Sequence, residues 1–386
     1  MNVTDFGAIP DANVAWGSPT ITWTGTDNAT KIQAAIDAYL TGTDDTLYFP
    51  PGRYLCSRGL MVGKAGGFVH ASVKGGGMNY RGYFSNAPCL FFTSADTPAI
   101  SFQGGRGCDW DGVSLYGPGI AWGYSQGLGN YAGALVDDTV SANWSDPSIL
   151  AVSPNSNGRY TPAAGFAIDP YSGVVPTPAY KGTYGMPLSS DMSFRNIWVG
   201  GFDTALVTQP SGADGNGDFI KIDRALIEYC RYGVSISQTQ SRNVSVRNTS
   251  FNQIHTALTN NKHGKQIGFF GGVIDNCSFG KGIQILDIGS TAYSGPMKFL
   301  SCYAEAMYIL GYIGGGNSVV ERSVIFDSLS ADFTLRLSRP IPQYLLTGFL
   351  STIPVLFNGG IYDLRGSTLA PSTARNIILY NTTVRL

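Results

Sequence analysis

The sequence predicts an all-β fold, a single-stranded right-handed parallel β-helix in which the chain winds into a solenoid of stacked rungs. Three observations lead to this prediction. The 386 residues include 50 glycines, roughly twice the usual share of ~7%, and 13% charged residues, about half the usual ~25%. Hydrophobic residues make up 43% of the chain and can build a sizeable core. A pattern of polar and apolar residues also recurs about every 25 residues.

The composition excludes several classes of protein. The glycines follow no three-residue period, so the chain is not collagen-like. A net charge of −1 provides no electrostatic footprint for nucleic acid or for an anionic membrane surface. The sequence contains no apolar run of about 18 residues, so no transmembrane helix is expected. We therefore expect neither a nucleic-acid partner nor membrane insertion.

The first predicted element is a capping helix over residues 27–40. Thr26 or Asp27 can cap its start, and Gly42 follows its end. Its apolar residues recur with the spacing of one helix face, at Ile32, Ala35, Ile36, Tyr39 and Leu40. Residues 46–55 then predict a short strand, a Pro-Gly turn and a second strand.

Residues 3–60 carry a family resemblance. They contain Asp5-Phe6-Gly7-Ala8, then an Asp-Asn pair before an Ile-Gln-Ala-Ala-Ile helix, then Leu-Tyr-Phe-Pro-Pro-Gly-Arg-Tyr. In that order, these motifs resemble the pectate-lyase-like β-helix superfamily, which includes bacteriophage tailspikes and polysaccharide depolymerases. The resemblance implies a homotrimer with parallel axes that acts on a surface or capsular glycan. Residues 9–25 depart from the family pattern, because they are longer and carry two tryptophans.

Six segments between residues 192 and 329 share one rung pattern. Each has an apolar residue, two polar residues, a small or apolar marker, any residue, and another apolar residue. Asn196, Asn248 and Asn276 each precede a marker, so we expect left-handed bends there. Spacings of 28, 24, 28, 25 and 22 residues between markers fit a solenoid with loops of different length. The markers are Ile197, Ala225, Thr249, Cys277, Cys302 and Val324.

The six cysteines predict no chemistry. They lie far apart, without a Cys-x-x-Cys motif, which argues against a zinc site. We expect buried free thiols, with Cys277 and Cys302 stacked inside the solenoid. Asp214 and Asp218 have the spacing that begins many calcium loops, but no glycine follows Asp218 and no glutamate closes the loop. We predict no cofactor and no metal, with calcium at this loop as the open alternative.

Residues 117–190 interrupt the rungs as a long insertion. These 74 residues contain six charged side chains, eleven glycines and nine aromatic residues. Aromatic faces stack on sugar rings, so the insertion predicts a glycan-binding wall. Equally, its aromatic residues could pack as a small core or against a neighbouring subunit. The candidate substrate-binding residues are Trp122, Tyr124, Tyr131, Trp144, Tyr160 and Tyr171.

A column of outward side chains is predicted two residues before each marker. Its members are Arg195, Asp223, Arg247, Asp275, Leu300 and Arg322. Asp223 and Asp275 would lie two rungs apart, roughly 9–10 Å, which suits the acid and base of an inverting glycosidase. Arg247 between them could bind an acidic group or, as in the polysaccharide lyases that the arrangement resembles, remove a proton. The alternative is a structural ladder of surface ion pairs.

A second outward column is predicted three residues after each marker. Its members are Gly200, Glu228, Asn252, Gly280, Glu305 and Asp327. Glu305 and Asp327 would lie one rung apart, about 5 Å, close to the geometry of a retaining glycosidase. Tyr303 shares their outward side and could donate a proton or contact substrate. Glu228 and His255 are further acid–base candidates, although polar turn residues explain the same pattern.

These observations favour one function over its alternative. The leading hypothesis is a tailspike-like enzyme that cleaves a polysaccharide by hydrolysis or β-elimination. The alternative is a non-catalytic virion protein that binds glycan or only builds structure. No secretory signal precedes the first motif, so we expect synthesis in the cytoplasm and a final place on the virion surface or outside the cell. The first motif follows Met1 closely, which favours a phage tail adaptor or a free enzyme.

The expected organisation has three parts. Residues 1–60 form the cap and first rung, and residues 61–330 form the β-helix with its insertion. Residues 331–386 lose the rung pattern and are expected to form a β-rich cap or an oligomerisation segment.

Overall fold

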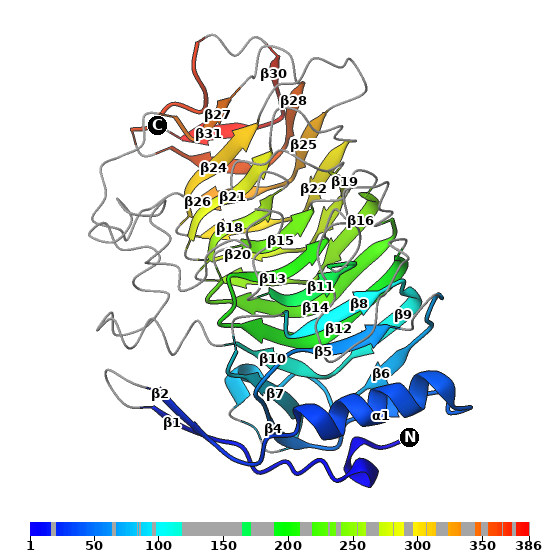
Figure 1. Ribbon diagram of the computed structural model, residues 1–386. Coiled ribbons are helices and arrows are strands. Elements are labelled where there is room, and N and C mark those ends of the chain that lie inside the picture. The colour runs from blue at the N-terminus through cyan, green and yellow to red at the C-terminus, as the bar shows by residue number, and fades with distance from the viewer. Residues whose placement is uncertain are drawn as a thin grey trace.

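The computed structural model arranges the chain as a stack of parallel strands (Figure 1). The predicted all-β parallel β-helix is confirmed, with a 20-stranded and a nine-stranded sheet wound around one core. The structure describes residues 1–16, 21–63, 67–82, 84, 86–94, 98–117, 164–170, 189–208, 218–230, 232–236, 241–252, 254–259, 270–280, 282–288, 296–305, 307–313, 323–332, 344–348, 354–364, 366–372 and 376–385.

The 20-stranded sheet bends along its length into two strips. The first strip contains β3 (Leu47–Tyr48), β6 (Ser72–Lys74), β9 (Arg106–Asp111), β16 (Ser241–Arg247), β19 (Phe270–Asp275), β22 (Met297–Leu300), β25 (Val324–Asp327), β28 (Val355–Asn358) and β30 (Ile377–Tyr380). The second strip contains β4 (Gly52–Cys56), β7 (Pro88–Phe92), β10 (Ser114–Tyr116), β17 (Ser250–Asn252), β20 (Ser278–Phe279), β23 (Tyr303–Glu305), β26 (Ser330–Asp332), β29 (Ile361–Asp363) and β31 (Thr383–Arg385). Two long strands, β12 (Ser190–Gly200) and β14 (Ile220–Glu228), run through both strips.

Single residues in the left-handed conformation make the corner between the strips. Asn196, Asn248 and Asn276 have φ values of 53°, 48° and 50°, as predicted. Asparagine adopts this conformation more readily than most residues, because its short polar side chain can bond locally. Each rung turns within one residue, so the side chains on both sides of the corner stay in register along the solenoid.

The nine-stranded sheet closes the third face of each rung. It contains β5 (Leu60–Gly63), β8 (Ile100–Gln103), β11 (Ala164–Ile168), β13 (Thr204–Thr208), β15 (Tyr232–Ile236), β18 (Ile254–Thr259), β21 (Gly282–Ile288), β24 (Met307–Ile313) and β27 (Leu346–Gly348). Inward side chains from the three faces form one continuous core. Within it, Phe299, Phe326 and Phe357 stack with ring centroids 4.9 and 5.0 Å apart.

The predicted capping helix, α1 (Ala29–Thr41), covers the N-terminal end of the solenoid (Figure 1). Its buried face includes Ile32 and Ile36 and packs against β5. Asp27 accepts a hydrogen bond from the backbone N–H of Ala29 at 3.1 Å, as one of the two predicted caps. The neighbouring Asn28 instead holds residue 9, donating to its carbonyl at 2.9 Å and accepting from its N–H at 2.7 Å.

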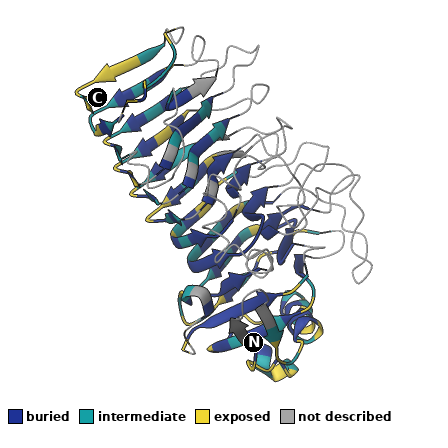
Figure 2. Ribbon diagram, turned by 90° about the vertical axis from the view of Figure 1, so that its left-hand side faces the viewer, coloured by how far each residue is buried: buried dark blue, intermediate teal, exposed yellow. Residues whose placement is uncertain are grey.

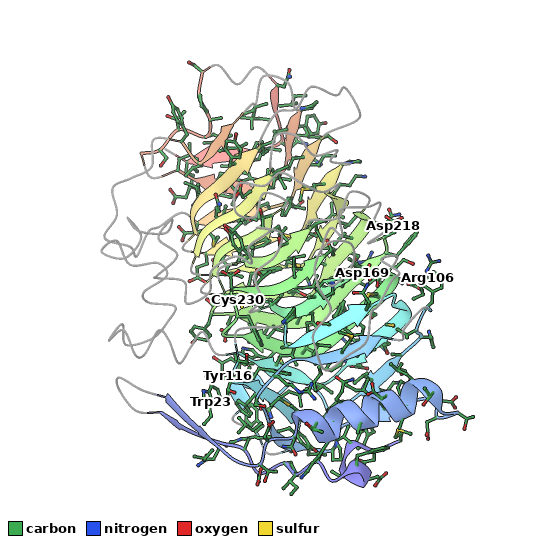
Figure 3. The ribbon with its side chains drawn as sticks, viewed as in Figure 1. Trp23, Arg106, Tyr116, Asp169, Asp218 and Cys230 are labelled. Carbon is green, nitrogen blue, oxygen red and sulfur yellow. The ribbon has the colours of Figure 1, made fainter. Side chains whose placement is uncertain are left out.

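Residues 9–16 and 21–25 of the long stretch lie outside the two strips of the solenoid (Figure 1). Strands β1 (Asn13–Trp16) and β2 (Ile21–Thr24) pair as an antiparallel hairpin. Asp11 holds the base of the hairpin, because its carboxylate accepts hydrogen bonds from the N–H and hydroxyl of Thr26 at 2.8 and 2.7 Å. Trp23 packs on Tyr116 of the second strip, with ring centroids 5.1 Å apart (Figure 3).

The insertion is anchored at two points. Strand β11 lies within residues 117–190 and pairs with β8 and β13, so part of the predicted insertion is a rung strand. Asp169 and Ser189 join the two sides of residues 171–188 through hydrogen bonds of 3.0 and 2.7 Å. Asp169 also accepts from the N–H of Gly104 at 3.0 Å and is completely buried. These contacts give Asp169 a structural role.

The C-terminal part corrects the predicted register. Tyr303 pairs with Ser330, so the marker that follows Cys302 is Leu329 and not Val324. Within the described part of residues 331–386, β28 to β31 continue both strips in parallel register. The rung pattern was hidden because its period changes, with 31 residues between Leu329 and the next corresponding position, Gly360.

All six cysteines are free and buried, as predicted. Burial raises the pKa of the Cys108 and Cys230 thiols to about 12, so both stay protonated and unreactive. Cys277 and Cys302 occupy the same inward position in neighbouring rungs. In the part of the chain that the structure describes, no helix is long and apolar enough to span a membrane.

Candidate active site

A column of alternating charges runs along the outer edge of the first strip. Its members, in rung order, are Lys74, Asp111, Arg195, Asp223, Arg247 and Asp275. The last four were predicted to stack, and the register brings them together as expected. We call these six residues the charge ladder. Opposite charges in directly neighbouring strands attract, so the ladder favours the observed register.

Ion pairs and hydrogen bonds connect the charge ladder with neighbouring residues, including the asparagines at the corner between the strips. Arg195 lies 2.6 Å from a carboxylate oxygen of Asp109 and 3.3 Å from one of Asp111. Asp223 accepts a hydrogen bond from the side-chain amide of Asn248 at 2.8 Å, and Asn248 accepts one from Asn276 at 2.7 Å. Ion pairs and corner asparagines thus give Asp223 structural partners, although 35% of its side chain remains exposed.

The alternation ends after Asp275. Leu300 follows in the column as predicted, and Asp327 follows Leu300. The predicted Arg322 does not belong to this column, because the corrected register places Asp327 at that position. Arg322 itself lies outside the described residues.

On the second strip, the buried Glu228 links three successive rungs. Its two carboxylate oxygens accept hydrogen bonds from the indole N–H of Trp198 at 3.1 Å and from the amide of Asn252 at 3.0 Å. The Trp198 ring lies over Gly200, where a Cβ atom would come within 2.4 Å of the indole. Only 2% of Glu228 is exposed, so a polymer has no access to it. We therefore assign the predicted acid–base candidate Glu228 a structural role.

An aromatic cluster next to Glu228 escaped the sequence analysis. Tyr116 packs against Phe91, Trp198 and Trp23 with ring centroids 5.2, 5.0 and 5.1 Å apart. Phe91, Tyr116 and Trp198 are buried although they project from the outer face of the strip. The unusual tryptophans of residues 9–25 were the available signal, but the register of the early rungs was needed to identify their partners.

Further along the second strip, three acidic residues occupy one outward position in successive rungs. Glu305 lies beside Asp332, and Asp332 lies beside Asp363. We call Glu305, Asp332 and Asp363 the acidic column. Asp327, the predicted neighbour of Glu305, is on the first strip instead, because Val324 is not a rung marker. Tyr303 faces outward next to this column, with 46% of its surface exposed.

The strand spacing of the acidic column is compatible with the carboxylate spacing of a retaining glycosidase. Neighbouring parallel strands are about 4.8 Å apart, and retaining glycosidases hold their two carboxyl groups about 5–5.5 Å apart. The column continues with a cation, because Arg385 lies beside Asp363 in the next rung. Glu305 is exposed and Asp332 is half-buried, so the pair can meet a large substrate.

The remaining predicted site residues do not join this cluster. His255 belongs to β18 in the nine-stranded sheet, whereas the charge ladder and the acidic column belong to the 20-stranded sheet. Asp214 and the aromatic candidates of the insertion lie outside the described residues, namely Trp122, Tyr124, Tyr131, Trp144, Tyr160 and Tyr171. Among the residues that are described, no three His, Cys, Asp or Glu side chains gather closely enough to hold a metal ion.

Asp332 is the member of the acidic column next to Glu305 that sequence reasoning missed. It fell outside the predicted rungs because the last spacing was taken as 22 residues, whereas Cys302 and Leu329 are 27 residues apart. The signal was present in the sequence, since Leu329-Ser330-Ala331-Asp332 repeats the outline of Cys302-Tyr303-Ala304-Glu305.

Comparisons with known proteins identify the fold. No protein-family model and no curated protein matches the sequence. Among solved structures, the Acinetobacter phage vB_ApiP_P1 tailspike protein aligns with a TM-score of 0.54 at 10% identity, over 100% of this chain and 58% of that chain. The enzymatically active domain of bacteriophage CBA120 tailspike protein 2 aligns with a TM-score of 0.51 at 12% identity, over 99% of this chain and 51% of that chain. The chain thus spans little more than half the length of these proteins, and it has the parallel β-helix fold of phage tailspikes.

Proposed function

We propose that this chain is a polysaccharide-degrading enzyme of the tailspike type, with Glu305 and Asp332 as its catalytic carboxylates. The observation that carries the proposal is a carboxylate pair one rung apart on an accessible outer face. The likeness of the fold to tailspikes supports it, since one of these structures is an enzymatically active domain. The substrate we propose is a surface or capsular glycan.

The spacing of the pair suits hydrolysis with retention of configuration. One carboxylate attacks the anomeric carbon and forms a glycosyl–enzyme bond, while the other, protonated, donates its proton to the leaving oxygen. The second group then removes a proton from the water that releases the sugar. The exposed ring of Tyr303 offers a face on which an adjoining sugar can stack.

The test begins with a panel of purified bacterial surface polysaccharides, from which one that the chain cleaves is chosen by release of reducing ends. Glu305→Gln and Asp332→Asn should each lower the rate at least about 100-fold, because each removes a group required for acid–base or nucleophilic catalysis. Asp223→Asn is the matched control on the first strip and should keep most of the activity. Full activity in both acidic-column variants would refute the site.

Asp223 and Asp275, with Arg247 between them, remain the second candidate site. Their two-rung separation of roughly 9–10 Å fits inverting hydrolysis, and Arg247 could serve as the base of a lyase. Complete loss of cleavage in both Asp223→Asn and Asp275→Asn would transfer the proposal to this site. Products with the ultraviolet absorbance of an unsaturated sugar would establish β-elimination.

A non-catalytic glycan-binding protein is the alternative function. The exposed Tyr303 stands between Ser278 and Ser330 in one outward column, and this surface could bind sugar hydroxyls without cleaving the chain. Binding to a glycan array without shortening of the polymer would favour this alternative. In either case we propose a place on the virion surface, a homotrimer, and a phage tail adaptor as partner.

A further inference from the structure

The side-chain amide of Asn252 has a direction that its neighbours fix. Its nitrogen donates a hydrogen bond to one carboxylate oxygen of the buried Glu228 at 3.0 Å, and Trp198 donates to the other oxygen at 3.1 Å. A carboxylate only accepts hydrogen bonds, so the nitrogen of the Asn252 amide, and not its oxygen, faces Glu228. The amide oxygen therefore points away from Glu228.

This oxygen lies over Gly280, which follows Asn252 in the same outward column of the second strip. A Cβ atom at Gly280 would come within 2.7 Å of the oxygen, so the glycine leaves room for the Asn252 side chain. Both residues are half-buried. Figure 2 shows intermediate and exposed residues along the outer edge of the stacked strands. Within the described residues, the Asn252 side chain hydrogen-bonds through its nitrogen, which leaves its oxygen to meet a ligand.

The Asn252 oxygen stands beside the proposed catalytic pair. Phe279 pairs with Ala304, so Gly280 and Glu305 occupy the same outward position in neighbouring rungs. Neighbouring rungs are about 4.8 Å apart, and the oxygen already reaches over the rung of Gly280. A sugar bound at Glu305 therefore comes within hydrogen-bonding reach of this oxygen.

We propose that Asn252 is a specificity-determining residue, whose oxygen accepts a hydrogen bond from a hydroxyl group of the sugar next to Glu305 and so selects a neutral polysaccharide. This inference rests on the proposed function, because it takes Glu305 and Asp332 as the catalytic pair. Glu228 is then a positioning residue, which acts on the substrate only by holding the Asn252 amide in one orientation.

The chemistry of this surface identifies the class of sugar that fits. A neutral sugar offers hydroxyl donors to the Asn252 oxygen. A uronic acid would bring a carboxylate, which only accepts, against that oxygen and beside the charges of Glu305 and Asp332. The cation of the acidic column, Arg385, is three rungs from Glu305 and does not compensate at this position. A site built to bond a donor rejects an analogue that lacks it, because its own polar groups stay unpaired.

Cleavage kinetics on a panel of purified neutral and uronic-acid-containing polysaccharides test the proposal, together with binding measured by isothermal titration calorimetry. The wild type should recognise a neutral member. On that polysaccharide, Asn252→Ala, which removes the oxygen, and Gly280→Ala, whose Cβ displaces it, should each raise KM and Kd about tenfold. The value of kcat should change less, because a contact made equally in the ground state and the transition state affects binding alone.

The matched control is Asn276→Ala. It also removes a side-chain amide, which donates to Asn248 at the corner of the neighbouring rung. This control should keep the KM and Kd of the wild type. Urea unfolding of each variant separates a loss of folding from a loss of binding.

A matched substrate distinguishes specificity from a merely structural role of Asn252. Oxidation of the primary hydroxyl groups of the same neutral polysaccharide converts them to carboxylates. The wild type should recognise the oxidised polymer at least about tenfold less well, and Asn252→Ala should narrow this preference. A structural role would leave the ratio between the two polymers unchanged.

Several results would overturn the inference. They are preference of the wild type for a uronic-acid polysaccharide, failure to recognise any neutral member of the panel, unchanged KM and Kd in both variants, and an equal loss in the control. If Glu305→Gln and Asp332→Asn abolish cleavage while Asn252→Ala and Gly280→Ala behave like the wild type, this inference alone fails. Full activity in Glu305→Gln and Asp332→Asn would refute the proposed function, and this inference with it.

Discussion

The charge ladder and the acidic column belong to neighbouring strips of the same solenoid, and they differ in the order of their charged residues. In the charge ladder, every carboxylate stands between cations or beside one, from Lys74 to Asp275. In the acidic column, Glu305, Asp332 and Asp363 follow one another directly, and Arg385 follows Asp363 in the next rung. The sequence had made Asp223 and Asp275 of the charge ladder the leading catalytic candidates, with Glu305 behind them.

The difference bears on which column carries the proposed chemistry. Alternating charges strengthen the register of parallel strands, so a structural role is sufficient to explain the charge ladder. Like charges in neighbouring strands repel, and we propose that Glu305 and Asp332 are kept together for catalysis. A carboxylate on a β-helix is therefore best judged by its neighbours in the rungs before and after it.

The largest expected effect comes from moving a carboxylate without changing its charge. Asp332→Glu lengthens the side chain by one methylene and displaces the carboxylate from its partner Glu305. We expect the rate of polysaccharide cleavage to fall about 100-fold, because misplacement of about 1 Å can cost that much. The same change in the charge ladder, Asp223→Glu, should leave the rate within about twofold, as measured by reducing-end release. Equal losses at the two positions would remove the distinction between the strips.

The next largest effect concerns the buried acid of the second strip. Glu228→Ala leaves the buried N–H of Trp198 and the amide of Asn252 without their acceptor. We expect the free energy of unfolding to fall by about 2–3 kcal/mol, measured by urea denaturation. Glu228→Gln, which keeps one acceptor oxygen, should cost less. If both variants are as stable as the wild type but inactive, Glu228 is catalytic and our structural assignment is wrong.

A smaller effect distinguishes the two strips by its size. Asp223→Asn removes an attraction to the neighbouring arginines and should destabilise the protein by about 0.5 kcal/mol. Asp332→Asn also removes repulsion by Glu305 and Asp363, so it should change stability in the unfavourable direction by less than Asp223→Asn does. Thermal unfolding of the two variants at low and high salt measures both terms, and salt should reduce both. Destabilisation of similar size in both variants would contradict the comparison.

The smallest expected effect concerns Asp27, a carboxylate that lies outside both strips. Burial raises the pKa of Asp27, but hydrogen bonds from Ser57 and Ala29 outweigh this and hold the pKa below its ordinary value. A carboxyl group with a lowered folded-state pKa stabilises the protein above its unfolded-state pKa of about 3.9, and the contribution is lost as pH falls through the folded value. Because the site is largely exposed, we expect no more than about 0.3 kcal/mol. Asp27→Asn should lower stability at pH 7 and flatten its fall in acid, as unfolding curves at several pH values would show.

The fold could be predicted from the sequence because a single residue makes each corner between the two strips. A single left-handed residue before each marker makes the bend, and the positions of Asn196, Asn248 and Asn276 were enough to align the strands of the charge ladder, although the bend of β14 is made by Arg224. Register failed at Val324, where the spacing between rungs changed and no asparagine marked the bend, which Ser328 makes instead. That one failure hid Asp332 and placed Asp327 on the wrong strip.

The contacts across the outer face could not be predicted in the same way. The docking of Trp23 on Tyr116 and the burial of Glu228 beneath Trp198 depend on side chains from rungs distant in sequence. No local pattern distinguishes a buried outward glutamate from an exposed one. Accessibility, which decides whether an acid can meet a polymer, follows only from the assembled solenoid.

The stereochemistry of cleavage depends on the distance between the two catalytic carboxylates. Proton NMR of the first products from a cleaved polysaccharide shows whether the new reducing end keeps the anomeric configuration of the original linkage. Catalysis by Glu305 and Asp332, one rung apart, predicts retention. Inversion, together with loss of activity in Asp223→Asn and Asp275→Asn, would contradict our account and place the chemistry in the charge ladder.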